Sequence, residues 1–309
     1  MDNYDVIIIG GAAAGSSAAL TLGRARRRVL VIDGGSPRNR FASGVHSYPG
    51  REGANPLELV ADMRIEASAY GVAYVDDTVA SVTGAVGDFT VTRASGTSAR
   101  ARRLIVATGL TDVLPDIPGL TELWGEKVHH CPYCHGWEVR DQAIAVLAVK
   151  PGSGHQALLL TQWTDDLTVV GEAELDPEQV RGVEVRGGRV LRTAVTAVRR
   201  IGDRVALDLA DGSVLERDAV FVASDPRPND ALLRALGAET VLEPNIGVEL
   251  VRVDFTGATS VPGVSAVGNV VEPMAQVLPA AAGGSRAAAA VNMMLVHDDV
   301  ALAFAEGAA

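Results

Sequence analysis

The stretch DVIIIGGAAAGSSAALTLGRARRRVLVID, residues 5–33, decides the fold. It predicts a buried strand over residues 5–9, a glycine turn, a helix to about Ala25, and a second strand over residues 28–32 that is followed by an acid. A strand, Gly-rich turn, helix and parallel strand in this order are typical of dinucleotide-binding units. The sequence therefore predicts an α/β fold that begins with such a unit.

Each residue of this turn has an expected task. Gly10 makes the tight turn, Gly15 permits close packing of the helix, and Asp33 accepts a hydrogen bond from a ribose hydroxyl. The start of the helix, which includes Ala14, would bind a pyrophosphate. Ala12 stands at the second glycine position of the fingerprint, and its methyl group would keep the phosphates slightly further away.

Composition excludes several classes of protein. The 309 residues are 48% hydrophobic, which is enough for the cores of about two domains. Lys and Arg number 27 against 38 Asp and Glu, so the net charge of −11 would repel nucleic acid, which we do not expect as a partner. Abundant glycine (33 residues) with only 4% aromatic residues is typical of α/β folds with tight turns.

We find no segment that resembles a targeting signal or a membrane anchor. The first apolar run, residues 6–9, is too short for the core of a signal peptide. The Ala-rich stretch 277–296 is interrupted by residues 283–286, which include an arginine, so it is not expected to cross a bilayer. We therefore expect a cytoplasmic protein without a membrane partner, in which a disulfide is more often catalytic than structural.

Two further glycine-bearing strand ends, residues 104–109 and 264–269, bracket a region with its own strands and helices. The simplest organisation builds one domain from both chain ends and inserts a second domain between them. Prolines stand near both expected crossings. We predict a discontinuous first domain (1–114 and 244–309) and an inserted domain (115–243), both Rossmann-like with three layers.

Both cysteines of the chain lie in the stretch HHCPYCHGWE, residues 129–138. The spacing of Cys131 and Cys134 lets their sulfurs close a small redox disulfide at the start of a helix, whose dipole favours a thiolate. The flanking His130 and His135 could take or give the thiol proton near neutral pH. These four residues are the expected catalytic group.

Other interpretations of the two cysteines are open but less favoured. A zinc site would need two more ligands, which His129 or His135 could supply only from awkwardly adjacent positions. Two unrelated buried thiols are the other alternative. If the pair is redox-active, thiol exchange alone moves electrons only between thiols, so a flavin held by the first domain is the economical partner.

The order of these motifs resembles the low-molecular-weight thioredoxin reductases over nearly the whole chain. The resemblance rests on the first fingerprint, the strand end at 107–109, the C-x-x-C pair, and the Val-Pro-Gly at 261–263 with the segment that leads into the last helix. It implies FAD as the cofactor and a homodimer. It also implies that Cys134 is the sulfur nearer the flavin and that Cys131 faces the substrate. The further residues that it places at the FAD are Ala107, Thr108, Gly109, Gly268, Asn269, Gln276 and Val277.

The chain departs from the reductases around the C-x-x-C pair and in the nucleotide fingerprint of the inserted domain. His135 replaces the aspartate that follows the second cysteine. An ungapped reading places Ala148, Lys150 and Ser153 at the three small positions of the fingerprint, and Lys150 would fill the approach of the pyrophosphate. A literal G-x-G-x-x-A at 152–157 comes four residues late, and we interpret it as a helix N-terminus rather than a fingerprint. The inserted domain is thus a degenerate pyridine-nucleotide type.

A third departure follows the strand expected at 167–170. Glu172 and Glu174 stand where a basic cluster would grip the 2′-phosphate of NADPH, and their charge would repel that phosphate. Glu172 could accept a hydrogen bond from the ribose of NADH, although a solvated loop acid is the favoured interpretation.

This pattern is similar to that of the dithiol oxidases of the same superfamily, which close the disulfides of gliotoxin-type and holomycin-type natural products without a nicotinamide cofactor. We expect an enzyme that oxidises a small dithiol through Cys131 and Cys134 and reduces dioxygen to hydrogen peroxide. The alternatives are a nicotinamide-dependent reductase of a thioredoxin-like protein and a flavin-bearing redox sensor. His46 could lie near the flavin by analogy, but a solvated loop histidine is the favoured interpretation.

Overall fold

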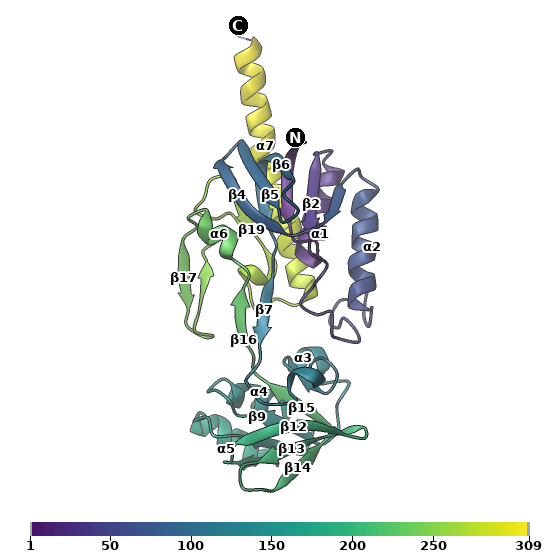
Figure 1. Ribbon diagram of the computed structural model, residues 1–309, viewed down its shortest axis with the longest axis vertical. Helices are drawn as coiled ribbons and strands as arrows, with labels where there is room; N and C mark the ends of the chain where they lie inside the picture. The colour runs from purple at the N-terminus through teal and green to yellow at the C-terminus, as the bar shows by residue number, and fades with distance from the viewer. Residues whose placement is uncertain (1, 308–309) are drawn as a thin grey trace. The chain divides into compact units, whose positions relative to one another are not determined.

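The computed structural model describes residues 2–307, which form two compact units (Figure 1). Unit 1 comprises Met1–Arg40, Asn55–Thr111 and Pro226–Ala309. Unit 2 comprises Phe41–Ala54 and Asp112–Asp225. Each unit contains a sheet with parallel strands and covering helices, so the predicted α/β class with two Rossmann-like units is confirmed.

The chain returns to unit 1 earlier than the position expected from the prolines. Unit 2 ends at Asp225 rather than near residue 244, because β16 (Asp225–Pro228) pairs with β7 (Leu110–Val113) and the segment after it packs in unit 1. Leu233 from that segment is fully buried in an apolar cluster of unit 1. The elements of the segment are α6 (Ala231–Ala235), β17 (Thr240–Glu243) and β18 (Val248–Val251).

The sheet of unit 1 follows the order β3-β2-β1-β6-β5-β4, and β19 pairs with β6. The strands β2 and β6 are parallel to β1, whereas β5 is antiparallel to both of its neighbours. The bounds are β1 (Asn3–Ile9), β2 (Val29–Asp33), β3 (Ala73–Asp76), β4 (Val79–Ala85), β5 (Asp88–Arg93), β6 (Ser98–Val106) and β19 (Val264–Ala266).

Alternation along β1 divides the core of unit 1 into two layers. Val6 and Ile8 pack with residues of α1 (Ala13–Arg24) and α7 (Val277–Gly307) on one face of the sheet. Ile7 lies in the cluster on the other face, with residues of β5. Both faces are apolar because a strand with parallel neighbours is covered on both sides. The other helices of unit 1 are α2 (Pro56–Ser68), which contacts α1, and the short η2 (Gly268–Val270).

Unit 2 is a three-layer arrangement around a parallel sheet of order β11-β10-β9-β15-β8. Residues of α4 and α5 pack on one face, and the antiparallel sheet β12-β13-β14 packs on the other. The bounds are β8 (Val128–His129), β9 (Ile144–Leu147), β10 (Leu167–Val170), β11 (Arg189–Leu191), β12 (Val195–Ile201), β13 (Arg204–Leu209), β14 (Val214–Arg217), β15 (Ala219–Val222), η1 (Thr121–Leu123), α3 (Pro132–His135), α4 (Ser153–Leu160) and α5 (Pro177–Val185).

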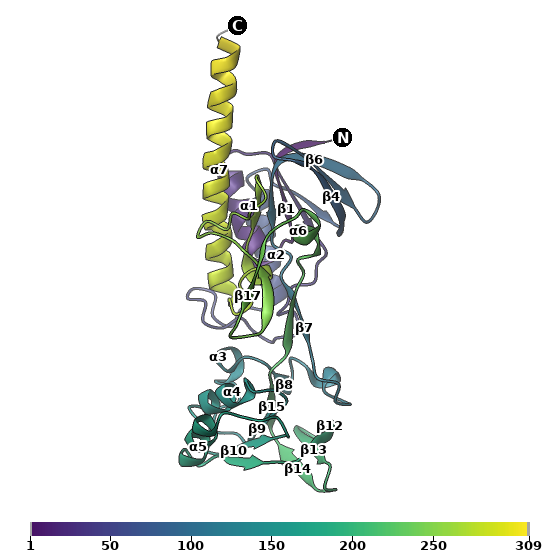
Figure 2. The ribbon, with the colours of Figure 1, turned by 90° about the vertical axis from the view of Figure 1, so that its left-hand side faces the viewer.

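The long helix α7 packs closely against α1 along its first half and continues beyond the sheet of unit 1 (Figure 2). Its buried residues are mostly small, which lets the two backbones approach each other. By length and composition alone α7 is also apolar enough to cross a membrane, a property that the interruption at 283–286 had led us not to expect. Gly283 and Gly284 lie on the buried part of the helix.

These two adjacent glycines give a matched test of the α1–α7 contact. A Cβ atom on Gly284 would lie 1.9 Å from the backbone oxygen of Ala14, whereas one on Gly283 would meet nothing closer than 3.9 Å. We expect Gly284→Ala to lower the free energy of unfolding by about 1–3 kcal/mol through overpacking. Gly283→Ala should leave it unchanged or raise it by up to about 1 kcal/mol, because alanine favours a helix. Urea unfolding of both variants checks this, and equal effects would contradict the close contact.

Candidate functional site

The first turn of unit 1 is built from backbone atoms in close contact. Gly10 has a φ of +100°, and a Cβ atom on it would lie 2.3 Å from the carbonyl oxygen of Ala107. A Cβ atom on Gly15 would lie 1.8 Å from the carbonyl oxygen of Gly10. Only glycine therefore fits at either position, as the fingerprint predicts. Residues Gly10, Gly15 and Ala107, which are separated in the sequence, meet at one point.

The end of β2 closes the same turn. The backbone N–H of Gly11 donates to a carboxylate oxygen of Asp33 at 3.0 Å. Helix α1 begins after Ala12, which has extended backbone and no side chain that caps the first turn. The N–H groups of that turn thus point out of the helix without a side-chain cap, which suits an anion.

The segment before α7 reaches the same helix start. Gly268 has a φ of +72°, and a Cβ atom on it would lie 2.9 Å from the Cβ atom of Ala14. Asn269 donates from its amide nitrogen to the carbonyl oxygens of Glu272, Pro273 and Ala275, and so fixes the turn before α7. Val277 is the first residue of α7, and the carbonyl of the preceding Gln276 accepts from the N–H of Ala280 at 3.0 Å.

Sequence reasoning missed the residue that holds Thr108 and Gly109. The Thr108 hydroxyl donates to the carbonyl oxygen of Asn229 at 2.7 Å, and the Asn229 amide donates to the carbonyl oxygen of Thr108 at 3.0 Å. The Asn229 N–H also donates to the carbonyl oxygen of Gly109. No local pattern marks Asn229, because its partners are distant in the chain.

The residues around the start of α1 fit the pyrophosphate of a dinucleotide. The turn leaves no room for side chains at two glycines, the helix start lacks a side-chain cap, and Gly268 approaches from the far end of the chain. The specific role of each predicted contact residue stays a prediction.

The C-x-x-C pair lies where β8 runs into α3. Cys131 is the residue that precedes α3, and Cys134 lies inside its four residues, so the predicted helix start is present. Both side chains are half-buried, and no disulfide joins them in this structure. The pKa of Cys131 is raised, chiefly by its hydrogen bond with Cys134 and then by burial. The Cys131 thiol is therefore held in its protonated form. The helix dipole contributes little here, because α3 has only four residues.

The imidazole rings on either side of the C-x-x-C pair in the sequence, His129 and His135, stack on each other. The ring centroids of His129 and His135 are 4.3 Å apart at an interplanar angle of 23°, and His129 also contacts Phe221. Burial lowers the pKa of His129 from 6.5 to about 3. Burial also lowers the pKa of His135, although the charge of Glu138 opposes this. His135 is thus held as a neutral base, and His129 is neutral above about pH 3.

His135 also has unused hydrogen-bonding capacity. Among residues 2–307, neither of its ring nitrogens has a hydrogen-bond partner, and the same holds for Nδ1 of His129. A buried nitrogen without a partner is costly in an ordinary core, and is explained more readily by a function than by packing.

His130 is positioned by backbone contacts. Its Nδ1 lies 3.3 Å from the carbonyl oxygen of Val222, and its own carbonyl accepts from the side-chain amide of Gln156 at 2.5 Å. His130 thus directly follows β8 and is joined to α4 through Gln156. Gln156 on α4 was not predicted from the sequence.

The loop of residues 41–54 brings a further histidine to this cluster. The His46 ring lies between Glu52, at 2.7 Å from Nδ1, and Glu138, at 3.5 Å from Nε2. His46 and Glu138 both belong to unit 2, and Glu138 follows α3. The interpretation of His46 as a merely solvated loop residue is therefore wrong.

The turn after β9 differs from the turn after β1. The ammonium group of Lys150 donates to the carbonyl oxygen of Ser224 and forms an ion pair with Asp225 at 2.7 Å. Lys150 follows β9, whereas Ser224 and Asp225 follow β15. The side chain therefore bridges the ends of two neighbouring parallel strands, at the point where the strand order reverses and where such sheets bind nucleotides.

The late G-x-G-x-x-A stretch is a helix start, as interpreted. Gly152 directly precedes α4, and Ser153 is its first residue. A Cβ atom on Gly154 would lie 2.4 Å from the side-chain oxygen of Gln179 on α5, so this glycine serves helix packing. Ala148 follows β9 directly, and the chain then needs four further residues to reach the helix.

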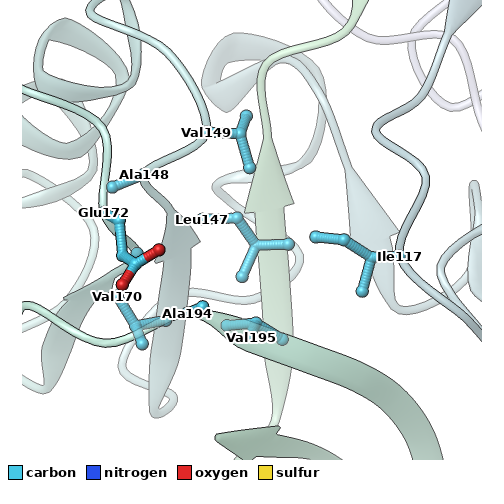
Figure 3. Close-up of a pocket in the computed structure, with 9 residues that line it drawn as sticks. Ile117, Leu147, Ala148, Val149, Val170, Glu172, Ala194 and Val195 are labelled. Atoms are coloured by element: carbon cyan, nitrogen blue, oxygen red, sulfur yellow. The ribbon is translucent and has the colours of Figure 1, made fainter. Parts of the chain in front are cut away.

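A small cavity of about 130 Å³ lies beside this turn (Figure 3). It is lined mainly by apolar residues at the ends of β9 and β10, and Glu172 is its one acidic lining residue among those described. Glu174 is exposed in the following loop. The Glu172 carboxylate thus lies where the resemblance to the reductases leads us to expect basic residues that bind the 2′-phosphate of NADPH.

The family model described as pyridine nucleotide-disulphide oxidoreductase matches residues 4–172 and 176–292. The chain belongs to this family. Members generally bind FAD.

Two relatives come from fungi. A protein named thioredoxin reductase sirT, from Leptosphaeria maculans, is 30% identical to this chain over 322 residues. The alignment covers 96% of each of the two chains. One named thioredoxin reductase tcpT, from Claviceps purpurea, is 32% identical over 281 residues, with 86% of both chains covered. The crystal structure of HlmI superposes with a TM-score of 0.94 at 42% identity, and covers 99% of this chain and 96% of that one.

The buried His129 predicts a measurable dependence of stability on pH. The unfolded chain protonates this residue near pH 6.5, whereas the folded protein does so only at about pH 3. Stability is therefore complete above pH 6.5 and falls as the pH decreases toward 3. His129→Phe should make the slope of unfolding free energy between pH 6 and 4 shallower by about 1.4 kcal/mol per pH unit. Urea unfolding at several pH values checks this, and the exposed His297→Gln should keep the wild-type slope.

Proposed function

We propose that this protein is an FAD-dependent oxidase that closes an intramolecular disulfide in a small dithiol and reduces dioxygen to hydrogen peroxide. The observation that carries the proposal is the pairing of a histidine-flanked C-x-x-C with a nucleotide crevice that Lys150 bridges. The first feature exchanges electrons with thiols, and the second obstructs the usual nicotinamide donor. Electrons would then enter from the dithiol rather than from NADPH.

The cysteines would carry out the exchange in their disulfide form. A substrate thiolate attacks Sγ of Cys131, the bond between the two cysteines breaks, and its electron pair leaves on Cys134. The second substrate thiol then attacks the mixed disulfide, so the substrate disulfide forms and Cys131 is released. Cys134 takes the leaving role in this proposal because the family resemblance places it nearer the flavin. Neutral His135 can accept a thiol proton.

Unit 1 would hold the FAD at the turn around Gly10, with Asp33 at the ribose and the start of α1 at the pyrophosphate. When bound, FAD supplies a two-electron acceptor that dioxygen can reoxidise. The balance over one turnover is one dithiol and one O2 consumed, and one disulfide and one H2O2 formed. We further propose that the protein works as a cytoplasmic homodimer, with no nucleic acid or membrane as a partner.

A nicotinamide-dependent disulfide reductase is the second candidate. The names of the fungal relatives favour it, since both are called thioredoxin reductases. Against it stand Lys150 in the crevice and Glu172 at the neighbouring cavity. Loss of two charge-assisted contacts to a phosphate corresponds to about 3 kcal/mol, or more than a hundredfold in affinity.

Anaerobic spectroscopy of the FAD-loaded protein separates the two candidates. A small dithiol should bleach the flavin absorbance, and air should restore it with about one H2O2 per dithiol consumed, because the proposed reaction has that stoichiometry. NADPH and NADH should not bleach it on the same timescale. Rapid stoichiometric bleaching by either nucleotide would instead make the protein a reductase.

Single-cysteine variants test the order of the two sulfurs. In Cys134→Ser the Cys131 thiolate should attack a linear small-molecule disulfide, expel one of its thiols and keep the other as a mixed disulfide that mass spectrometry detects, since Cys134 is absent and cannot resolve it. Cys131→Ser should give much less of this adduct, because Cys131 is the expected site of exchange with the substrate. An adduct that forms mainly on Cys134 would reverse the assigned roles.

A further inference from the structure

Two large aromatic side chains beside the C-x-x-C pair are exposed. Tyr133 stands between the two cysteines in the sequence and is 61% exposed, and Trp137, three residues after Cys134, is 65% exposed. Aromatic residues make up only 4% of the chain, so two exposed rings in one short segment are uncommon here. Exposed apolar side chains that lie together mark a binding site more often than scattered ones do.

The local backbone places both rings on one face of a helical turn. The N–H of Gly136 donates to the carbonyl oxygen of Pro132 at 2.7 Å, and Gly136 itself keeps helical dihedral angles, so the turn continues past the end of α3. Residues four apart on a helix are neighbours on its surface. Tyr133 and Trp137 have this spacing, whereas Pro132, Gly136 and Val139 are buried toward the core of unit 2.

The ring of Tyr133 is held from its inner side. It meets the ring of Trp163 edge-on, with centroids 5.8 Å apart and an interplanar angle of 87°. The Trp163 indole also lies against the backbone of Gly136, where a Cβ atom would lie 2.9 Å from the indole. Trp163 is partly buried against the core of unit 2. The Tyr133 ring is therefore fixed along one edge while most of its surface faces solvent.

The indole of Trp137 is covered on one face only. The guanidinium carbon of Arg140 lies 4.1 Å from the centroid of the indole, and the same side chain donates to the carbonyl oxygen of Trp137 at 2.7 Å. The hydrogen bond keeps the cation over the ring. The other face of the indole is already oriented toward solvent, so a ligand that stacks on it would immobilise little side-chain freedom.

The exposed aromatic area suits a small molecule rather than a protein. A Tyr or Trp side chain buries about 150–250 Å² when it is fully covered, so the exposed parts of the two rings amount to about 200–300 Å². A stable protein–protein interface needs about 800 Å² on each partner. One flat ring covers the smaller area, and its π-system would stack on the exposed faces.

We propose that Tyr133 and Trp137 bind a flat, apolar ring of the substrate and thereby select dithiols that carry such a ring. The proposal rests on the function proposed above, because it names the class of dithiol that is delivered to Cys131. Tyr133 and Trp137 contact the body of the substrate and determine specificity, whereas the two cysteines exchange the electrons. Trp163 and Arg140 are positioning residues that hold the two rings.

The principal experiment compares 1,2-benzenedimethanethiol with dithiothreitol as anaerobic reductants of the FAD-loaded, full-length protein. The preference is the ratio of the two second-order rate constants for bleaching of the flavin. A double variant, Tyr133→Leu with Trp137→Leu, keeps apolar side chains but removes both rings, and the preference for the aromatic dithiol should fall by about tenfold or more. Tyr133→Phe should keep the preference because the ring remains. The matched control Phe304→Leu, which removes an exposed ring on α7, should also keep it.

Three results would overturn the proposal. An unchanged preference in the double variant would mean that the rings do not contact the substrate. An equal loss for both dithiols would give the rings a role in the structure of α3 or in contact with the flavin. If reduced thioredoxin bleaches the wild-type flavin faster than the aromatic dithiol does, and the loss in the double variant is confined to thioredoxin, the two rings bind a protein.

A second measurement does not require reduction of the flavin. In Cys134→Ser, mass spectrometry follows the rate at which Cys131 forms a mixed disulfide with dibenzyl disulfide and with bis(2-hydroxyethyl) disulfide. Leucine substitutions at Tyr133 and Trp137 should lower the ratio of these two rates by about tenfold as well. If neither dithiol bleaches the wild-type flavin, the proposed function is wrong, and this ratio alone decides whether the rings recognise a flat ligand. An unchanged ratio would then overturn their recognition role.

Discussion

Burial of the C-x-x-C pair is the constraint on which the chemistry of unit 2 depends. In a low-dielectric site every charged form is disfavoured, which lowers the pKa of His129 and His135. The pKa of Cys131 is raised chiefly by its hydrogen bond with Cys134, and burial adds to this. The same burial that would make isolated thiolates unfavourable leaves a neutral base ready beside them. If a dithiol and an imidazole lay at the surface, solvent would keep the pKa of each close to its ordinary value. The imidazole would then be protonated over more of the range near neutral pH.

Both units contain a parallel sheet, but the turn after β1 in unit 1 and the turn after β9 in unit 2 differ in their side chains. In unit 1 the turn at Gly10 is emptied of side chains, so a large ligand can approach the backbone. In unit 2 the corresponding region contains Lys150, whose ammonium group contacts the end of β15. A parallel sheet provides a crevice at its reversal point in both cases. Whether the crevice serves a ligand depends on the few residues of one turn.

The sequence predicts features that depend on local patterns, and these include the first unit, the strand and helix order, and the helix start at Cys131. It places the return to unit 1 too late, because the pairing of β16 with β7 joins segments that no local pattern relates. The sequence does not predict the contact of His46 with Glu138 either, because the two residues are distant in the chain. The sequence also predicts a thiolate on Cys134 from a helix dipole, but α3 has only four residues, so it can supply little of one, and the thiolate stays a prediction.

The contacts of Lys150 determine what a single replacement at this turn would do to the charge of the crevice. Its positive charge is matched by Asp225, and Glu172 adds another carboxylate at the neighbouring cavity. Removal of the lysine alone would leave these acids without their cation and make the region more negative, which would repel a dinucleotide more strongly. A positively charged crevice would therefore require several coordinated replacements rather than a change at Lys150 alone.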